Sequence, residues 1–402
     1  MRRALIIIAI ILVLLGIGVA TYFLFFARTA GIAVAPTGSV SLPVAGQQEV
    51  PDIGIVNTSS TTPVIAPVPV SARLVKISAG PVVLGEVLVD IPAKNASSSP
   101  GVAINYIERE SGNVFSYLTN TKTITRTSNK TIPGIQSASW LPNASLAFVR
   151  YLSGTDFSTI NTYALPANGV GGFFLPQNLA DIAVSSTSVL TLTSGVNGSV
   201  ASLERTDGTH AISIFSTPLS ALRVSFAGKN QYLAYTKPSA TLPGYAFLVS
   251  GTGRFSPVVG PQNGLVALAS PSGKWVLVSY TLVNAMQMTL INTVTGETFP
   301  LPVATIADKC AWMADDSVIY CGIPMNPPAD IAYPDDWYQG AVHFSDRIWK
   351  IQVSGRYAQL VLDFPKETND DSLDAEAMAI NSFGTVLSFV NKNDGSLWGY
   401  SL

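Results

Sequence analysis

Aromatic and acidic side chains gather in two stretches near the C-terminal end of this chain. The stretch from Pro324 to Asp346, PMNPPADIAYPDDWYQGAVHFSD, supplies the candidate ligand-binding residues Asp335, Asp336, Trp337, Tyr338 and His343. The stretch from Lys366 to Glu376, KETNDDSLDAE, adds Asp370, Asp371 and Asp374. Trp and Tyr rings offer apolar faces to a sugar or an apolar side chain, and loops on a rigid scaffold often carry binding residues. Both stretches therefore predict a ligand-binding site, unless the first only caps its own part of the fold, with Trp337 and Tyr338 buried beneath it.

The same carboxylates permit two other kinds of chemistry. Asp370, Asp371 and Asp374 are oxygen donors suited to Ca²⁺, although a DNDG-like calcium spacing is absent. We therefore expect no cofactor and no metal, with Ca²⁺ as the alternative. Glycosidases use two carboxylates, which leaves a glycan-active hydrolase as the alternative to a non-enzymatic protein. A Ser-His-Asp triad would need His210 or His343, and His343 has Ser345 and Asp346 too close in sequence for triad geometry. We predict no catalytic residues.

The two cysteines flank one predicted hairpin, KCAWMADDSVIYCG. If Asp315-Asp316 forms its two-residue turn, Cys310 and Cys321 lie directly opposite each other, at a separation that a disulfide can bridge. An oxidising compartment would permit this bond. The alternative is a pair of buried thiols, because free Cys packs as a small hydrophobic residue.

Composition excludes several classes of protein. The 402 residues are 48% hydrophobic and 12% charged with a net charge of −2, which permits a large core and argues against disorder over most of the length. Nucleic-acid binding needs clustered basic residues, which this balance does not provide. Two cysteines cannot make a disulfide-rich scaffold or a four-thiolate zinc site.

The N-terminus predicts a membrane anchor followed by a spacer. Residues 4–26 are uncharged and apolar, and such a helix spans roughly 35 Å, enough for a bilayer. Arg2 and Arg3 place the N-terminus in the cytoplasm, and we expect residues 1–28 to be a single-pass anchor. A cleaved signal peptide is the alternative, although its apolar region would be shorter. Residues 29–70 are rich in Pro, Ser and Thr and read as a flexible linker to an extracytoplasmic domain at 71–402.

From residue 71 onward, short β-branched and aromatic runs alternate with turns, which is typical of all-β domains. One hairpin, ALASPSGKWVLVSY, has looser copies at intervals of about 41 to 44 residues, a period typical of β-propellers with four strands per blade. Equivalent positions are Ser139, Ala183, Val224, Ala267 and Ala311. The next copy comes about 25 residues late, and this delay marks the insertion at Pro324–Asp346.

The count gives a seven-bladed propeller, with six blades as the alternative. The last unit ends after three strands, at GSLWGYSL, and RLVKIS at Arg73–Ser78 is a spare strand before the first unit. We predict that this strand completes the last blade and closes the ring, since closure removes two exposed sheet edges.

The segment ASPSGKWVLV resembles the repeat of TolB-type, WD40-like β-propellers, in which a Ser-Pro-Asp-Gly-Lys turn joins two inner strands. SWLPNASLAFV, VSFAGKNQYLAY and AWMADDSVIY are looser copies. The resemblance implies a propeller fold and an envelope setting, and it carries over no catalytic residues because the repeat is structural.

These observations together predict a non-enzymatic binding or scaffold protein of the bacterial cell envelope. The partner would be another envelope protein or a cell-wall glycan. A glycan hydrolase using carboxylates of residues 324–346 and 366–376, and a purely structural surface component, are the alternatives.

Overall fold

The computed structural model of the protein describes residues 73–93, 100–328, 330–368 and 372–402. Within those ranges, the helices are too short or too polar to cross a bilayer. The predicted anchor at residues 4–26 and the predicted linker at 29–70 lie outside the described residues, as do Asp370 and Asp371.

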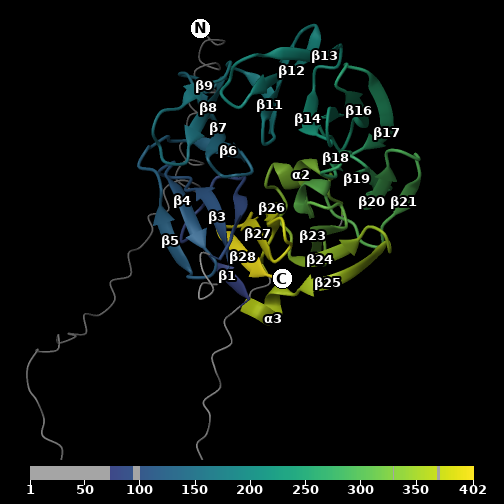
Figure 1. The fold of residues 1–402 in the computed structure, drawn as a ribbon. Helices are drawn as coiled ribbons and strands as arrows, with labels where there is room; N and C mark the ends of the chain where they lie inside the picture. The colour runs from purple at the N-terminus through teal and green to yellow at the C-terminus, as the bar shows by residue number, and fades with distance from the viewer. Residues whose placement is uncertain (1–72, 94–99, 329, 369–371) are drawn as a thin grey trace, which may run out of the picture. The chain divides into compact units, whose positions relative to one another are not determined.

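The described residues fold into an all-β, seven-bladed propeller with four antiparallel strands in each blade (Figure 1). Blade one contains β2 (Val87–Ile91), β3 (Gly101–Ile107), β4 (Val114–Leu118) and β5 (Thr123–Arg126). Blade two contains β6 (Ile135–Trp140), β7 (Leu146–Ser153), β8 (Thr159–Pro166) and β9 (Phe173–Phe174). Blade three contains β10 (Leu179–Val184), β11 (Ser188–Gly195), β12 (Gly198–Arg205) and β13 (Ile212–Thr217).

Blade four contains β14 (Leu222–Phe226), β15 (Gln231–Thr236), β16 (Pro243–Ser250) and β17 (Phe255–Asn263). Blade five contains β18 (Val266–Ala269), β19 (Trp275–Leu282), β20 (Ala285–Asn292) and β21 (Thr298–Pro300). Blade six contains β22 (Cys310–Trp312), β23 (Val318–Pro324), β24 (Asp346–Gln352) and β25 (Tyr357–Leu362). Blade seven contains β26 (Ala375–Ile380), β27 (Val386–Asn391), β28 (Leu397–Ser401) and β1 (Leu74–Lys76).

Blade seven closes the ring with strands from both ends of the described chain. β1 pairs antiparallel with β28, with Leu74 opposite Tyr400 and Val75 opposite Gly399. The predictions of seven blades and of closure by the strand within Arg73–Ser78 are therefore confirmed. Because β1 covers the free edge of β28, the last blade has no missing strand.

The repeated turns tie each blade to the next, as the hairpin of blade five shows. Gly273 has a positive φ of 76°, and a Cβ at this position would lie 2.1 Å from the Ala227 carbonyl oxygen of blade four. Asp316, in the equivalent turn of blade six, accepts hydrogen bonds from Ser270 Oγ at 2.8 Å and Ser272 N at 3.1 Å. The turn residues are therefore determined by contacts between blades, with glycine required where the backbones approach.

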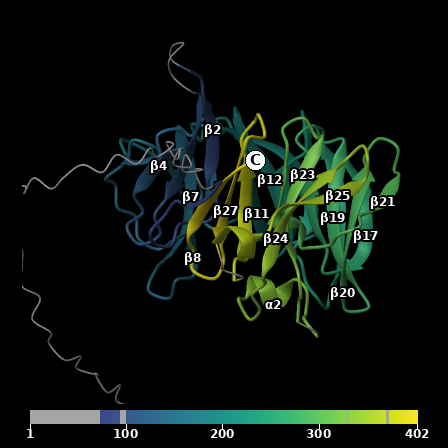
Figure 2. The same ribbon diagram turned by 90° about the horizontal axis from the view of Figure 1, so that it is seen from below.

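Blade six carries the predicted insertion, which lies between the second and third strands of the blade. The insertion contains the short helix α2 (Asp335–Tyr338), which lies beyond the strand ends on one face of the ring (Figure 2). Two other short helical segments lie in links between blades: η1 (Ala307–Lys309) before β22, and α3 (Phe364–Thr368) after β25. We call the side of the ring that carries α2 the insertion face.

Candidate functional site

A fully buried ion cluster attaches the insertion to the propeller. Lys309, Asp346 and Asp374 have no solvent-exposed side-chain surface. Lys309 Nζ donates to Asp346 Oδ2 at 2.8 Å and also to Asp374 Oδ1. Each residue stands at the start of a strand or just before it, namely β22, β24 and β26. Residues at the starts of strands in blades six and seven therefore meet in one buried charged cluster.

Aromatic side chains of the insertion cover this cluster. Trp337 Nε1 donates to both carboxylate oxygens of Asp374, at 3.1 and 3.2 Å, and Phe344 N donates to Asp374 Oδ2 at 2.9 Å. The Lys309 ammonium lies 4.9 Å from the Trp337 ring centroid and 5.0 Å from that of Phe344. Burial raises the pKa of Asp346 to about 6, against the opposing effect of the Lys309 charge.

The structure separates the predicted ligand-binding residues into groups. Trp337 is 3% exposed and Asp374 is fully buried, so neither faces solvent as a ligand contact. The burial of Trp337 agrees with the alternative in which the insertion caps its own part of the fold, since the indole covers and binds the buried Asp374. The contact between Trp337 and Asp374 places the insertion beside the residue that precedes β26.

Asp335 and Asp336 hold the insertion in shape. Asp335 Oδ2 accepts a hydrogen bond from Ala240 N of blade four at 3.1 Å, and Asp336 Oδ2 accepts one from Ala332 N at 2.9 Å. Both carboxylates thus satisfy backbone N–H groups that lie outside the helix. The insertion therefore reaches across the ring from blade six to blade four.

Tyr338 joins the insertion to a second charged group, formed by Arg223 and Asp308. Tyr338 Oη donates to Asp308 Oδ2 at 2.7 Å, and the same oxygen receives Arg223 Nη1 at 2.9 Å. Burial and the Asp308 carboxylate raise the pKa of Tyr338 well above its usual value, so the phenol remains a donor. The sequence contains no motif for this group, since its members come from blade four, the link before β22 and the insertion.

His343 and Tyr338 also line a polar cleft of about 490 Å³ on the insertion face. The opposite wall comes from blades one, two and seven and contains the charged or amide side chains Arg109, Gln136, Glu376, Lys392 and Asp394. Lys392 Nζ lies 3.2 Å from Glu376 Oε2 and 4.7 Å from the Trp337 ring centroid. The cleft thus combines His343 and Glu376, which lie in the two predicted stretches, with residues of blades one, two and seven that carry no motif and that sequence reasoning missed.

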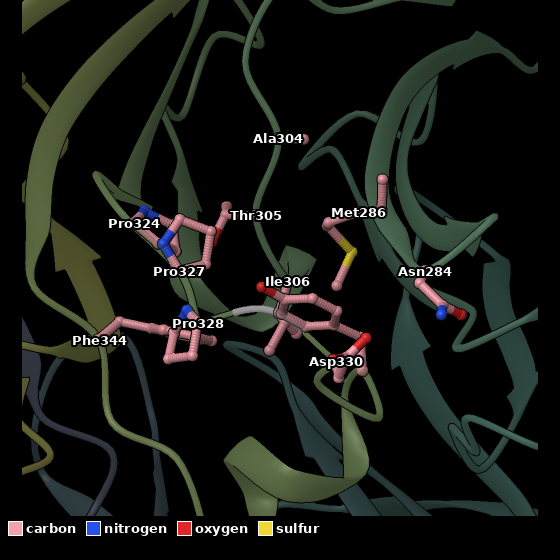
Figure 3. A pocket seen from close by; sticks show the side chains of 12 residues that line it. Asn284, Met286, Ala304, Thr305, Ile306, Pro324, Pro327, Pro328, Asp330 and Phe344 are labelled. Atoms are coloured by element: carbon pink, nitrogen blue, oxygen red, sulfur yellow. The ribbon is translucent and has the colours of Figure 1, made fainter.

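A smaller pocket of about 300 Å³ lies on the other side of the insertion (Figure 3). Pro324, Pro327 and Pro328 face Asn284 and Met286 of blade five across it. Its lining is mainly proline, aliphatic and aromatic, so it offers apolar contact and few groups for acid–base chemistry.

The described residues contain no group of three or more His, Cys, Asp or Glu side chains placed to hold a metal ion. Both oxygens of Asp374, one of the three candidate Ca²⁺ ligands, already accept hydrogen bonds within the cluster. His210 lies in a turn with φ of 57° and contacts Thr209 Oγ1 at 2.8 Å. Asp346 binds Lys309 and is therefore engaged away from any triad with His343.

Cys310 and Cys321 are joined by a disulfide at the inner end of blade six. They are direct partners in the β22–β23 register, with Cα atoms 4.1 Å apart and an S–S bond of 2.12 Å. The predicted register, with residues 311 and 312 opposite 320 and 319, is confirmed.

No family model and no curated protein matches this chain. Among solved structures, an oligogalacturonate lyase in complex with manganese is 9% identical, with a TM-score of 0.51 over 82% of this chain and 98% of that one. Hydrazine synthase of Kuenenia stuttgartiensis is 12% identical, with a TM-score of 0.51 over 82% and 97%. TolB from Acinetobacter baumannii is 9% identical, with a TM-score of 0.44 over 70% and 64%. At these identities the first two show a shared propeller fold, and function has to be argued from the site.

Proposed function

We propose that this chain is a non-enzymatic binding propeller of the cell envelope, with its propeller outside the cytoplasm. Its insertion face would dock a cell-wall glycan or another envelope protein. The observation that carries the proposal is the polar cleft of about 490 Å³, one wall of which is an insertion held in place by a buried ion cluster. A rigid loop that borders a polar cleft on a propeller is suited to binding.

The chemistry of the cleft favours a glycan as its occupant. Arg109, Gln136 and His343 provide donors for sugar hydroxyls or carboxylates, and Glu376 and Asp394 provide acceptors. Tyr338 Oη is bound to Asp308, and the exposed part of the Tyr338 side chain adds an aromatic surface at the same wall. A glycan with alternating hydroxyl and amide groups can hydrogen-bond to both the donors and the acceptors of this lining.

Two features support the extracytoplasmic placement. The protein has the Cys310–Cys321 disulfide, and disulfides form and persist in oxidising compartments. The sequence also begins with the apolar segment at residues 4–26, which fits an anchor that leaves the propeller outside. The resemblance of its hairpin to TolB-type repeats is consistent with an envelope setting.

Titration of the purified full chain with soluble cell-wall glycan fragments tests the proposal. We expect saturable binding by calorimetry, weakened at least about tenfold, or about 1.4 kcal/mol, by Arg109→Ala and by His343→Ala. The matched control is Arg126→Ala, on the outer strand β5, which should bind as the unmodified protein does. Binding that is unaffected by both cleft variants would show that this cleft is not the site.

A protein partner is tested separately by crosslinking from envelope fractions. A photo-crosslinking residue at position 343 should capture a discrete partner, whereas the same residue at position 126 should not. Capture at both positions alike would contradict docking at the insertion face.

A glycan-active hydrolase is the second candidate, and Glu376 is the observation that favours it. Glu376 and Asp394 both line the cleft, and burial raises the pKa of Glu376, as a general acid requires. A screen of cell-wall and model glycosides should then show turnover that Glu376→Gln abolishes. Turnover that Glu376→Gln retains, or none across the screen, would remove the support for this candidate.

A further inference from the structure

We propose that Lys309 and Asp374 become joined by an intramolecular isopeptide bond, with Asp346 as the proton carrier of the reaction. The Lys309 side chain is fully buried between two carboxylates that are also fully buried. The side chains that form the bond lie 65 residues apart in sequence and belong to the links before β22 and β26. The bond would therefore connect blade six covalently to blade seven.

Asp374 is the carboxyl group prepared for attack. Lys309 Nζ contacts Asp374 Oδ1, while Trp337 Nε1 and the Phe344 backbone N–H both donate to Asp374 Oδ2, at 3.1 and 2.9 Å. Two donors on one oxygen form the arrangement that stabilises the negative charge of a tetrahedral intermediate. The nucleophile and the oxyanion donors thus meet at a single carboxyl carbon.

Asp346 is placed to move the protons. Its Oδ2 lies 2.8 Å from Lys309 Nζ and is held by the backbone N–H of Ala375 at 2.7 Å. Its Oδ1 is buried and has no hydrogen-bond partner among the described residues. Burial also raises the pKa of Asp346 to about 6, which suits a carboxyl that alternately accepts and releases a proton.

The reaction balances without an external reagent. Transfer of one proton from the Lys309 ammonium to the Asp374 carboxylate gives a neutral amine and a neutral carboxylic acid. The amine nitrogen bonds to the Asp374 carbonyl carbon, and Asp346 takes a proton from that nitrogen and delivers it to the departing hydroxyl. The C–OH bond breaks, one water leaves, and an amide remains beside the Asp346 carboxylate. The net charge of the cluster is −1 before and after the reaction.

The surroundings favour the amide. Three charged groups without solvent contact are costly to bury, and condensation removes one positive and one negative charge. The reacting groups are held in contact by the fold, which removes the entropic barrier to their encounter. Trp337 and Phe344 cover the cluster and keep water from reversing the reaction.

Mass spectrometry of the purified, reduced and denatured full chain tests the bond directly. We expect an intact mass lower than the sequence mass by one water. Trypsin should leave Lys309 uncut and release Trp275–Arg347 joined as a branched peptide to Glu367–Lys392. A full sequence mass, with a separate peptide that ends at Lys309, would overturn the proposal. A loss of water without the branch would point to an aspartyl imide and would overturn it equally.

Variants test the assigned roles, with disulfide formation and circular dichroism as measures of folding. Lys309→Arg keeps the positive charge without a primary amine, and it should show the full sequence mass. Asp346→Asn keeps both joined residues, and it should also show the full mass if Asp346 carries the proton. Loss of water in Asp346→Asn at the level of the unmodified protein would refute that role. Asp315→Asn, in an exposed turn of the same blade, is the matched control and should retain the loss of water.

Discussion

At the residue scale, Glu86 is an example of a single ionisable side chain that the fold buries. It is 7% exposed and accepts a hydrogen bond from Ser388 Oγ of blade seven at 2.7 Å, while its Oε2 has no partner among the described residues. Burial raises the pKa of Glu86 to about 7. The folded protein therefore holds a proton here that the unfolded chain releases near its ordinary value of 4.5.

Glu86 should make the folded state less stable as the pH rises. A folded pKa above the unfolded one means that its stabilising contribution is complete below about pH 4.5 and is lost as the pH rises to about 7. The loss should be about 3 kcal/mol for a fully buried group. We expect Glu86→Gln to remove this component, measured by urea unfolding at pH 4.5 and pH 8. Equal pH dependence of the variant and the unmodified protein would contradict the assignment.

At the element scale, the insertion is held by the buried Trp337 and by hydrogen bonds of the Asp335 and Asp336 carboxylates. Tyr333, Trp337 and Phe344 belong to the same buried cluster as residues of blades four, five and six. The insertion is therefore part of the close-packed core, and this packing makes its outer wall rigid.

Removal of the indole donor should loosen the insertion. Trp337→Phe keeps an aromatic ring but loses the hydrogen bonds to the buried Asp374 carboxylate, which should cost about 1.5–3 kcal/mol. Denaturant unfolding measures this cost, and limited proteolysis should show faster cleavage within residues 325–345. Trp275→Phe, at a half-buried position in blade five, is the control and should cost less. Equal effects of the two variants would argue against an anchoring role for Trp337.

The disulfide should stabilise blade six through its closed loop. Its two cysteines are 11 residues apart, and closing a loop of this size in the unfolded chain is worth about 3 kcal/mol. Cys310→Ala combined with Cys321→Ala should lower the free energy of unfolding by about this amount. Addition of a reductant should destabilise the unmodified protein and leave the double variant unchanged. A double variant that responds equally to the reductant would show that the effect lies elsewhere.

At the scale of the whole molecule, the ring is closed by three residues of β1. Leu74 is 6% exposed and packs in one buried cluster with Tyr400 and Phe389 of blade seven and Leu362 of blade six. Arg73 adds a hydrogen bond from its Nε to the Ser401 carbonyl at 2.9 Å. A short strand thus keeps the first and last parts of the propeller together.

Weakening this strand should affect the entire ring. Leu74→Ala removes buried methyl groups and should cost about 2–5 kcal/mol. It should also increase aggregation, because opening of β1 exposes the edge of β28. Unfolding and light scattering measure the two effects, with Val294→Ala, at a position 79% exposed, as the control. A cost no larger than that of the control would mean that ring closure does not depend on β1.

The sequence by itself determined the repeat and predicted the closing strand and the register of the cysteine hairpin, whereas the structure decided between seven blades and six. These predictions follow from patterns that can be read along the chain, namely the alternation of apolar residues within strands and the regular period of the turn residues. The position of the insertion followed from the same period, because Ala379 appears later than the repeat requires. Only the tertiary structure decided what the insertion does. Trp337 and Asp374 were predicted as ligand contacts but are buried, because Lys309 lies between Asp346 and Asp374 and Trp337 covers this cluster. A single lysine in a link between blades carries no signal of burial, and its partners come from separate segments that meet only when the ring closes.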